Sequence, residues 1–337
     1  MKILVSGGAG YIGGSVAGLL AQRGHQAVIF DNLGHAKREL LPAGVKFVQG
    51  ELADRGAIEE LFIAAKKQGE PFDGVLHFAA LIEAGESMVK PEIFFRNNTA
   101  CTLSLLEAVL AHGPRRFVFS STAAVYGEPE TVPISEDAHL LPTNAYGESK
   151  LLVERMLDWF HRIHGLRSAS LRYFNVAGAP ESLDGSIPRG EAHDPETHLI
   201  PLVLDVALGR RKSIKIFGED YPTPDGTCIR DYIHVSDLAE AHLLALDALE
   251  GDAARSARLI FNLGNGQGFS VREVIESARR VTGHPIPAEV CPRRAGDPAR
   301  LIASSEKAMR ELGWKPKYTQ LDEILRTAWV WHQKRYA

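Results

Sequence analysis

The chain has few of the residues that mark metal, disulfide or membrane proteins. Its 337 residues include only three cysteines, Cys101, Cys228 and Cys291, which are scattered without metal-ligand spacing. We therefore expect reduced, structural thiols and no metal site. No apolar run is long enough to span a bilayer. An apolar strand predicted from Lys2 leaves no room for a signal peptide, which predicts a cytoplasmic protein.

An excess of charge of one sign is also lacking. Lys and Arg number 38 and Asp and Glu 42, and the net charge is −4. No basic patch indicates nucleic acid or an anionic membrane as a partner. The content of 45% hydrophobic and 24% charged residues is typical of a globular protein. The length allows one large α/β domain and a smaller one.

A cluster of glycines follows the first predicted strand. Residues 2–6 are a short apolar run and residues 16–23 have helical periodicity; between them stand Gly7, Gly8, Gly10 and Gly13. They fit both G-x-G-x-x-G and G-x-x-G-x-x-G, and strand, glycine turn and helix are the context that supports a dinucleotide fingerprint. Glycines let the backbone approach a pyrophosphate, and the helix start offers free N–H groups to the anion.

An acidic residue ends the second predicted strand. Asp31 follows the apolar residues 27–30, and a carboxylate about 20 residues beyond the glycines can bind a ribose 2′-hydroxyl. Its charge would repel a 2′-phosphate, so the sequence favours NAD over NADP. Lys37 and Arg38 are close enough to keep NADP open.

Tyr146 and Lys150 stand four residues apart, a spacing that places both on one face of a helix. A cation near a phenol favours the phenolate, so we expect Lys150 to lower the pKa of Tyr146 toward neutrality. With an NAD site, the pair predicts hydride transfer at a secondary alcohol, with Tyr146 taking the hydroxyl proton. Thr122, just after a predicted strand at 116–121, is expected to bond the same hydroxyl, or else to satisfy backbone at the strand end.

Predicted strands alternate with predicted helices through the first half of the chain. The strands cover 2–6, 27–30, 45–49, 74–78, 116–121 and 168–174, and the helices 16–23, 57–67, 91–111 and 145–164. This alternation predicts an α/β fold with a doubly wound parallel sheet of the Rossmann type. Ligands bind beyond the carboxyl ends of such strands. That edge gathers the glycine loop, Asp31, residues 78–80, residues 120–122 and residues 174–175.

The second half has a different character. Residues 176–197 and 218–226 are predicted loops, 199–208 a helix and 214–217 a strand. Strands at 231–235 and 259–262 could return to the first domain, and helices are expected at 271–282, 306–312 and 321–332. We predict an NAD-binding domain of residues 1–176 and 231–264. Residues 177–230 and 265–337 would form a smaller C-terminal α/β substrate domain.

With these motifs, the chain resembles the extended short-chain dehydrogenase/reductase family over nearly its whole length. Its later motifs resemble the members of that family that epimerise UDP-glucose and UDP-galactose. The superfamily motifs are residues 7–13, 30–32, 77–80, 85–87, 97–98, 120–127 and 146–150. The motifs that are more specific to the epimerases are residues 172–175, 216–218, 220–223, 225–227, 230–235 and 293–297.

The resemblance implies a redox cycle with no net oxidation. Tightly bound NAD takes hydride from C4 of the sugar, the 4-keto intermediate turns, and the hydride returns to its other face. Tyr146 acts as base and then as acid, and Lys150 could bind the nicotinamide ribose. The UDP-sugar is then the partner, together with a second copy of the chain in a homodimer. The helices at 91–111 and 145–164 could form its interface, or their apolar faces could simply be core.

The resemblance also assigns two sets of contacts. Those to NAD are Gly7, Gly10, Tyr11, Ile12, Gly13, Asp31, Asn32, Glu51, Leu52, Phe78, Ala79, Ala80, Asn97, Ser120, Tyr146, Lys150 and Phe174. Those to the UDP-sugar are Thr122, Tyr146, Asn175, His198, Leu199, Phe217, Arg230, Tyr232, Arg294, Asp297 and Leu301. Arginines suit a diphosphate because their planar groups donate several hydrogen bonds. The alternative for Arg230 and Arg294 is a surface ion pair with Asp231 or Asp297.

Four positions depart from the pattern of the family. Glu51 replaces an aspartate that binds the adenine amine, and Ile82 replaces a lysine that some members place near the cofactor. His198 replaces an asparagine, and it is either a diphosphate contact or a helix-start residue. Leu301 stands where some members carry a tyrosine that excludes N-acetylated sugars. Leucine is smaller, so we expect UDP-N-acetylglucosamine to be accepted, unless Leu301 is core.

Three other functions compete. A dehydratase needs acidic residues after Thr122, but Ala123 and Ala124 stand there. A UDP-glucuronate enzyme needs a cation for the sugar carboxylate, and this possibility stays open. A regulator that senses NAD without chemistry would not need Tyr146, Lys150 and Thr122 together.

Overall fold

The structure is a computed structural model that describes residues 1–181, 190–250, 258–294 and 297–337. A seven-stranded sheet forms its centre, with every neighbouring pair parallel and the order β11-β6-β5-β4-β1-β2-β3. The strands are β1 (Lys2–Ser6), β2 (Gln26–Asp31), β3 (Lys46–Gln49), β4 (Gly74–His77), β5 (Arg116–Thr122), β6 (Arg167–Tyr173) and β11 (Arg258–Leu263). The predicted doubly wound parallel sheet is confirmed.

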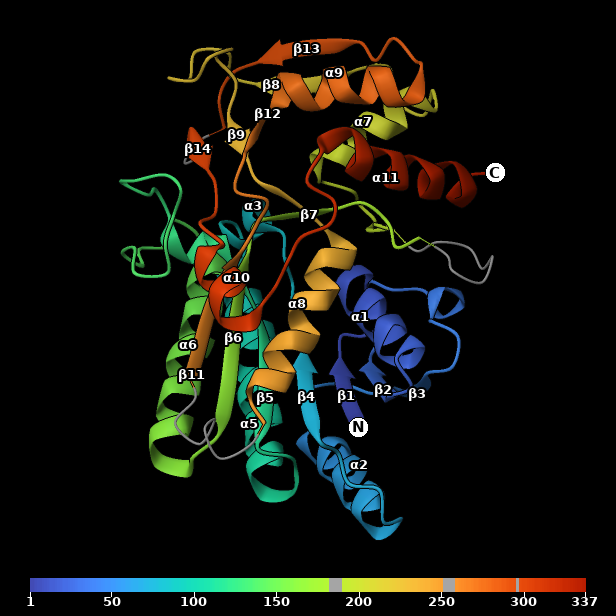
Figure 1. The fold of residues 1–337 in the computed structure, drawn as a ribbon, viewed down its shortest axis with the longest axis vertical. Coiled ribbons are helices and arrows are strands. Elements are labelled where there is room, and N and C mark those ends of the chain that lie inside the picture. The colour runs from blue at the N-terminus through green and yellow to red at the C-terminus, as the bar shows by residue number, and fades with distance from the viewer. Residues whose placement is uncertain (182–189, 251–257, 295–296) are drawn as a thin grey trace.

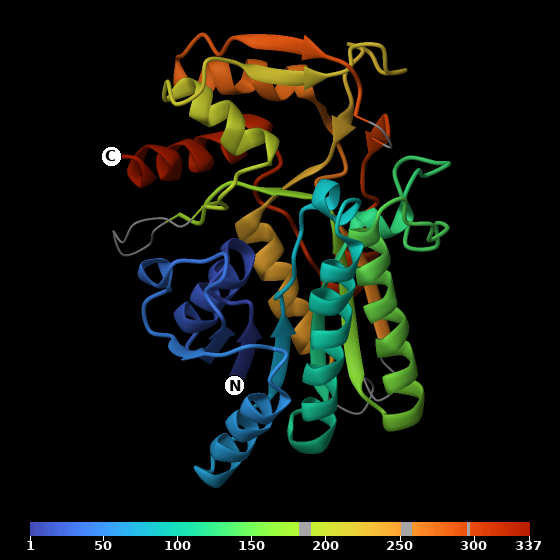
Figure 2. The ribbon, with the colours of Figure 1, turned by 180° about the vertical axis from the view of Figure 1, so that it is seen from behind.

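Helices cover both faces of this sheet because its strands are apolar on both sides. In β1, Ile3 and Val5 pack on one side with α1 (Tyr11–Gln22) and α8 (Val235–Ala248). Leu4 packs on the other side with α2 (Arg55–Lys67), α5 (Cys101–His112) and α6 (Ala145–His164). Figure 1 shows the first pair in front of the sheet, and Figure 2 shows the other three helices from behind. Successive residues of a strand point to opposite faces, so one strand contributes to both cores.

A second layer lies beyond the carboxyl ends of the strands. It packs α7 (Leu199–Ala207), α9 (Val271–Thr282) and α11 (Leu321–Arg335) with the parallel pair β8 (Ile214–Phe217) and β13 (Ala288–Cys291) around a separate core. In Figure 1, the arrowheads of β1, β2 and β4 point toward this layer. The edge of the main sheet at which such folds bind ligands therefore faces the second layer.

Short elements connect the two layers. The strands are β7 (Asn175–Ala177), β9 (Ile229–Arg230), β10 (Tyr232–His234), β12 (Phe269–Ser270) and β14 (Arg300–Leu301). The helical segments are η1 (Arg38–Leu40), α3 (Ala84–Ser87), α4 (Pro91–Phe94), the π-helical η2 (Phe95–Ala100), η3 (Ala123–Tyr126) and α10 (Glu306–Leu312). No helix in the described ranges is both long and apolar enough to cross a membrane.

Several boundaries differ from the sequence prediction. The strand expected at 231–235 pairs with β7, and only β11 of the two returning strands joins the main sheet. The helix expected at 91–111 contains the π-helical turn η2. Helix α8 was not predicted, and helix α1 begins at Tyr11, directly after the glycine turn. Part of the predicted loop 176–197 lies outside the described residues.

Candidate active site

The predicted catalytic pair, Tyr146 and Lys150, lies in the first turns of α6. The Asn144 side chain caps the helix by accepting a hydrogen bond from the backbone N–H of Gly147 at 2.8 Å, and the Ser87 hydroxyl accepts one from the N–H of Tyr146 at 3.1 Å. A Cβ atom on Gly147 would lie 2.6 Å from the carbonyl oxygen of Ala124. Glycine at this position therefore lets α6 approach η3 closely, which brings Tyr146 to the end of β5.

Tyr146 and Thr122 meet as predicted, but the electrostatics differ from the prediction. Burial raises the pKa of Tyr146 to about 12; the hydrogen bond with the Thr122 hydroxyl lowers it in part, and the charge of Glu83 raises it. The expectation that Lys150 lowers this pKa was wrong for this structure. The Lys150 ammonium instead donates to the carbonyl oxygen of Ser120 at 2.9 Å, and burial lowers its own pKa to about 7.

The Thr122 hydroxyl also makes a second hydrogen bond. It accepts a hydrogen bond from the backbone N–H of Ala124 at 3.1 Å and so caps η3. The interpretation that Thr122 satisfies backbone at the strand end is therefore confirmed, while its bond to the sugar hydroxyl stays a prediction; the contact with Tyr146 is a third feature. The bond to the backbone and the contact with Tyr146 are compatible because a hydroxyl both donates and accepts.

The glycine loop is packed so tightly that it excludes side chains. A Cβ atom on Gly7, whose φ is 73°, would lie 2.3 Å from the nitrogen of Ala79, and one on Gly13 would lie 2.4 Å from the oxygen of Gly7. No side chain caps the start of α1, and its first turn has no acidic residue. The free N–H groups and the helix dipole there suit an anion. The loop therefore fits the pyrophosphate of a dinucleotide.

The predicted adenosine contacts gather beside this loop. The Asp31 carboxylate accepts hydrogen bonds from the backbone N–H groups of Ala9 at 3.1 Å and Leu33 at 2.8 Å, so it fixes the glycine loop. The Asn32 amide donates to the Glu51 carboxylate at 3.1 Å. Glu51 therefore lies beside Asn32, and its contact with the adenine amine stays a prediction. Leu52, the next residue, packs against the core below the loop.

The loop after β4, which contains Phe78, Ala79 and Ala80, is held from η2. The Asn98 side chain accepts from the backbone N–H of Leu81 at 2.8 Å and donates to its carbonyl oxygen at 2.9 Å. Asn97 donates to the side chain of Asn98 at 2.9 Å. Because π-helical turns often occur at functional sites, η2 fits a role in presenting these asparagines.

Further predicted cofactor contacts lie at the ends of β5 and β6. The hydroxyls of Ser120 and Tyr173 form a hydrogen bond. Burial, and secondarily the neighbouring Tyr146, raises the pKa of Tyr173. Phe174 follows β6 and packs in a small core with Leu301. Glu83 acts on Tyr146 and was not singled out from the sequence, whereas Tyr173, on which Tyr146 acts, belongs to the motif at residues 172–175 but was not assigned a role.

On the substrate side, the structure pairs the predicted charges. Arg230 and Asp297 form an ion pair, with 11% and 25% of their side chains exposed, so the pair that the alternative named is present, although it is partly buried rather than at the surface. Asp231 does not pair with Arg230, because its carboxylate accepts hydrogen bonds from the backbone of Asn265, Gly266 and Ala303. The Arg294 guanidinium lies 4.0 Å from the centre of the Phe217 ring.

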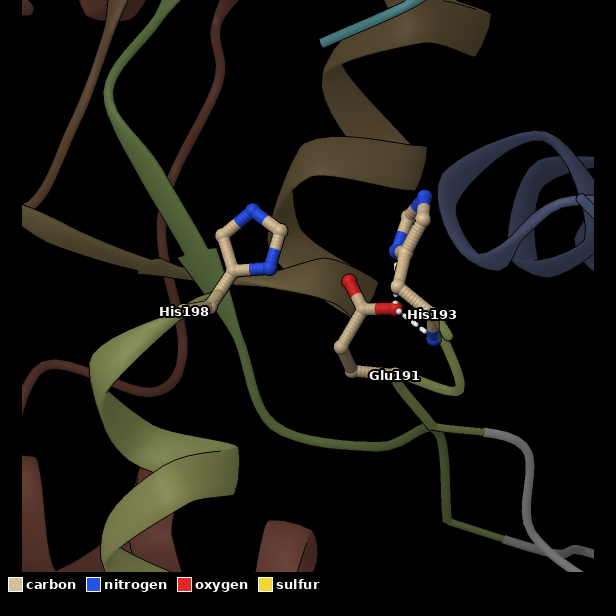
Figure 3. Close-up of side chains that lie close together, drawn as sticks. All are labelled: Glu191, His193 and His198. Carbon is tan, nitrogen blue, oxygen red and sulfur yellow. Dashed lines mark hydrogen bonds and ion pairs between the residues drawn. The ribbon is translucent and has the colours of Figure 1, made fainter. Parts of the chain in front are cut away.

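The remaining substrate candidates lie on the segments between the layers. Asn175 pairs with Tyr232, and Leu301 pairs with Arg230 in β14. His198 precedes α7, whose first residue is Leu199, and its Nδ1 lies 2.8 Å from the Glu196 carboxylate. His198 also lies close to Glu191 and His193, which the sequence did not single out (Figure 3).

Comparison with known proteins identifies the family. The model for the NAD dependent epimerase/dehydratase family matches residues 3–264. A UDP-glucose 4-epimerase of Streptomyces lividans is 53% identical over 98% of this chain and 96% of its own length.

Two solved structures extend the likeness to the fold. UDP-glucose 4-epimerase from Brucella ovis in complex with NAD is 43% identical, with a TM-score of 0.89 and coverage of 97% of both chains. The UDP-Glc/GlcNAc 4-epimerase of Campylobacter jejuni is 41% identical, with a TM-score of 0.83 and coverage of 99% of both chains. The chain therefore belongs to the NAD dependent epimerase/dehydratase family, and its relatives within that family are UDP-glucose 4-epimerases.

Proposed function

We propose that the protein interconverts UDP-galactose and UDP-glucose by inverting C4 of the sugar. The observation that carries this proposal is the contact between Tyr146 and Thr122 at the end of β5, beside a glycine loop that excludes side chains. The similarity to UDP-glucose 4-epimerases over 98% of the chain supports the substrate.

The chain's own residues handle the proton. Bound NAD supplies the acceptor and then the donor of the C4 hydride. Thr122 hydrogen-bonds the hydroxyl of Tyr146, and Tyr146 takes the proton of the sugar 4-hydroxyl and later returns it. The C–H electron pair leaves as hydride while the O–H proton goes to Tyr146, so oxidation to the 4-ketone is balanced. Return of the hydride to the opposite face of C4, with return of the proton from Tyr146 to O4, would give the epimer.

Inversion also requires that the protein hold the diphosphate and leave the sugar free to turn. We propose that Arg230 and Arg294 hold the UDP diphosphate, with Phe217 and Asp297 positioning the two guanidinium groups. Arginine suits this role because its charge persists and its donors are planar. Asn175, Leu199, Tyr232 and His198 would line the rest of the UDP site.

The first experiment is to incubate the purified protein with UDP-galactose, with no NAD added, and to assay UDP-glucose. Product is expected, since the cofactor must stay bound throughout the cycle. If no product forms and added NAD does not restore turnover, the proposed substrate is wrong. A dehydratase is already disfavoured, because the buried Ala123 occupies the position where its acid would stand. UDP-glucuronate should then be tested.

Leu301 is proposed to set the width of the sugar site. It is partly buried and packs in the small core that contains Phe174, a cofactor contact candidate, so it is close to the predicted site even though it also serves the core. We expect the wild-type enzyme to epimerise UDP-N-acetylglucosamine. In Leu301→Tyr, kcat/KM for that sugar should fall at least about tenfold relative to kcat/KM for UDP-glucose, since a steric clash that costs about 1.4 kcal/mol lowers a rate or binding constant tenfold. Undetectable wild-type turnover of the acetylated sugar, under conditions where UDP-galactose reacts, would contradict this.

We also propose that two copies of the chain pair through α5 and α6. Large apolar side chains are exposed on these helices, namely Leu103 on α5 and Trp159 and Ile163 on α6, and Ile93 is exposed on the preceding α4. Light scattering of the purified protein should give twice the chain mass, and Leu103→Glu should shift the protein toward monomer. A wild-type monomer at micromolar concentration would contradict the proposal. We place the protein in the cytoplasm, in keeping with its three free cysteines, which cell fractionation can check.

A further inference from the structure

A cavity beside the glycine loop has walls from three segments. They are residues 9–11 in the glycine loop and the start of α1, residues 35–40 after β2, and residues 190–193. The start of α1 is the place where a dinucleotide diphosphate binds. Residues 190–193 therefore form a wall of the same space, although they lie about 180 residues away in the sequence and belong to no dinucleotide fingerprint.

This wall is fixed by the C-terminal helix. The indole of Trp331 donates to the carbonyl oxygen of Glu191 at 2.9 Å, and the Arg335 guanidinium donates to the carbonyl oxygens of Glu191 at 3.1 Å and Ala192 at 3.0 Å. The Tyr11 hydroxyl donates to the carbonyl oxygen of Gly178 at 2.6 Å, which ties the start of α1 to the beginning of the same loop. Trp331 and Arg335 thus hold the wall at Glu191 and Ala192, and Tyr11 is held by its own bond to Gly178.

His193 is the charged donor that this wall presents. Its Nδ1 lies 2.5 Å from the Glu191 carboxylate, while Nε2 has no hydrogen-bond partner among the described residues. Figure 3 shows Nε2 at the end of the ring remote from Glu191. Burial alone would lower the pKa of His193, but the hydrogen bond and charge of Glu191, with Glu196 and Glu83, raise it to about 8. The imidazole is therefore held as a cation near neutral pH.

A metal site is the competing use of these residues. The potential ligand atoms of Glu191, His193 and His198 all lie within 4.8 Å of one another. Zinc bonds of about 2.0–2.1 Å in a tetrahedron would bring ligand atoms to about 3.4 Å. The Oε1 atom of Glu191 already accepts from the N–H groups of Ala192 and His193 and faces Nδ1 of His193. The arrangement fits ion-paired imidazoliums better than metal ligands.

We propose that His193 retains the cofactor, with its Nε2–H donating to the diphosphate of the bound dinucleotide. The positive charge of His193 would replace that of the lysine that some members of the family carry at the position of Ile82. His35 and Lys37 line the same cavity but are exposed, so the half-buried His193 makes the stronger contact. The inference rests on the proposed function, because that function needs a cofactor that does not leave.

The test is the rate at which the full-length protein loses NAD during dialysis, followed by release and chromatography of the remaining nucleotide. His193→Phe removes donor and charge, and His193→Gln keeps a donor without the charge. Loss of NAD should accelerate about tenfold or more in His193→Phe, in line with a hydrogen bond to a charged group, and less in His193→Gln. The control, His112→Gln, alters an exposed histidine at the far end of α5 and should match wild type.

A pH series separates charge from packing. Because the pKa of His193 is raised, the imidazolium persists below about pH 8 and is lost above it, so wild-type NAD retention should weaken as pH rises through 8. The groups that face His193 are Glu191, Glu196, Glu83, His198, His35 and Lys37. His193→Phe should lack this pH step.

Three outcomes would overturn the proposal. NAD loss from His193→Phe could equal that of wild type. The variant could instead weaken UDP binding to the NAD-loaded enzyme in calorimetry, which would assign His193 to the other diphosphate. Wild type could bind one Zn²⁺ per chain that His193→Phe does not. None of these measurements requires epimerisation, so a protein that holds NAD but does not epimerise would refute the proposed function and leave this inference standing.

Discussion

Tyr146→Phe is expected to lower kcat for the conversion of UDP-galactose to UDP-glucose by about 10³-fold, within the range of about 10²–10⁴ that a positioned proton-transfer group contributes. The phenyl ring fills the same space, so NAD content and folding should be unchanged. What is lost is the hydroxyl that bonds Thr122 and exchanges the proton of the sugar. The measurement is initial rate at saturating UDP-galactose, with the bound nucleotide quantified in the same preparation.

Tyr336→Phe is the matched control, because it removes a hydroxyl from a tyrosine near the C-terminus without touching the site. It should keep wild-type turnover. Tyr146→Phe could instead keep more than about a tenth of the wild-type rate. The loss would then be smaller than general acid–base catalysis supplies, and the role given to Tyr146 would be wrong.

The electrostatics of the site explain why this effect should be large. With a pKa near 12, Tyr146 is protonated at neutral pH in this structure, so it is already the acid that the reverse half-reaction requires. To act as base, it needs positive charge beside it. Burial of Lys150 lowers the pKa of that ammonium to about 7, and its present partner is the carbonyl oxygen of Ser120. Sequence spacing predicted that the two residues lie on one helix, but only the packing around them shows what their charges do.

The N-terminal half of the fold was predictable because its signals are local. Long apolar strands, the glycine turn and helical periodicity each occupy a continuous run, and the sheet matches them to within a few residues. The two-residue strands β9, β12 and β14 carry no periodicity of their own, since their pairing partners are distant in sequence. Helix α8 was missed because the predicted strand at 231–235 includes the first residue of the helix, Val235. Both β10 and α8 are largely buried, so their apolar residues form one run with no visible boundary.

In the candidate site, too, the residues with local sequence signals were predictable and the others were not. The glycine loop, Asp31 and the Tyr146–Lys150 pair have fixed spacings and could be found from sequence. Glu83 acts on Tyr146 through space from the segment after β4, and it also raises the pKa of His193, which lies on the segment before α7. The effect of such residues on neighbouring pKa values depends on which segments lie together at the carboxyl edge of the sheet, and no spacing between residues in the sequence predicts that arrangement.

Gly13→Ala is expected to have the second large effect, and the chain supplies its own control. A Cβ atom on Gly13 would lie 2.4 Å from the oxygen of Gly7 and 2.9 Å from the Cα of Gly8, both of them backbone atoms. The glycine loop must therefore move. Overpacking of this kind costs about 1–3 kcal/mol of folding free energy. The displaced loop should also lose NAD at least about tenfold faster, because its N–H groups no longer converge on the diphosphate.

Gly18→Ala makes the same substitution in the same helix, but its Cβ atom would meet only the side chain of Pro42 at 3.6 Å, an ordinary contact. Alanine is preferred to glycine inside a helix by about 0.8–1.0 kcal/mol, so this variant should be as stable as wild type or more stable. Urea unfolding and NAD content of the two variants decide the point. If both behaved alike, helix propensity would explain the glycines of α1. Only a loss confined to Gly13→Ala shows that the absence of a side chain there serves the cofactor, since propensity acts equally on both positions.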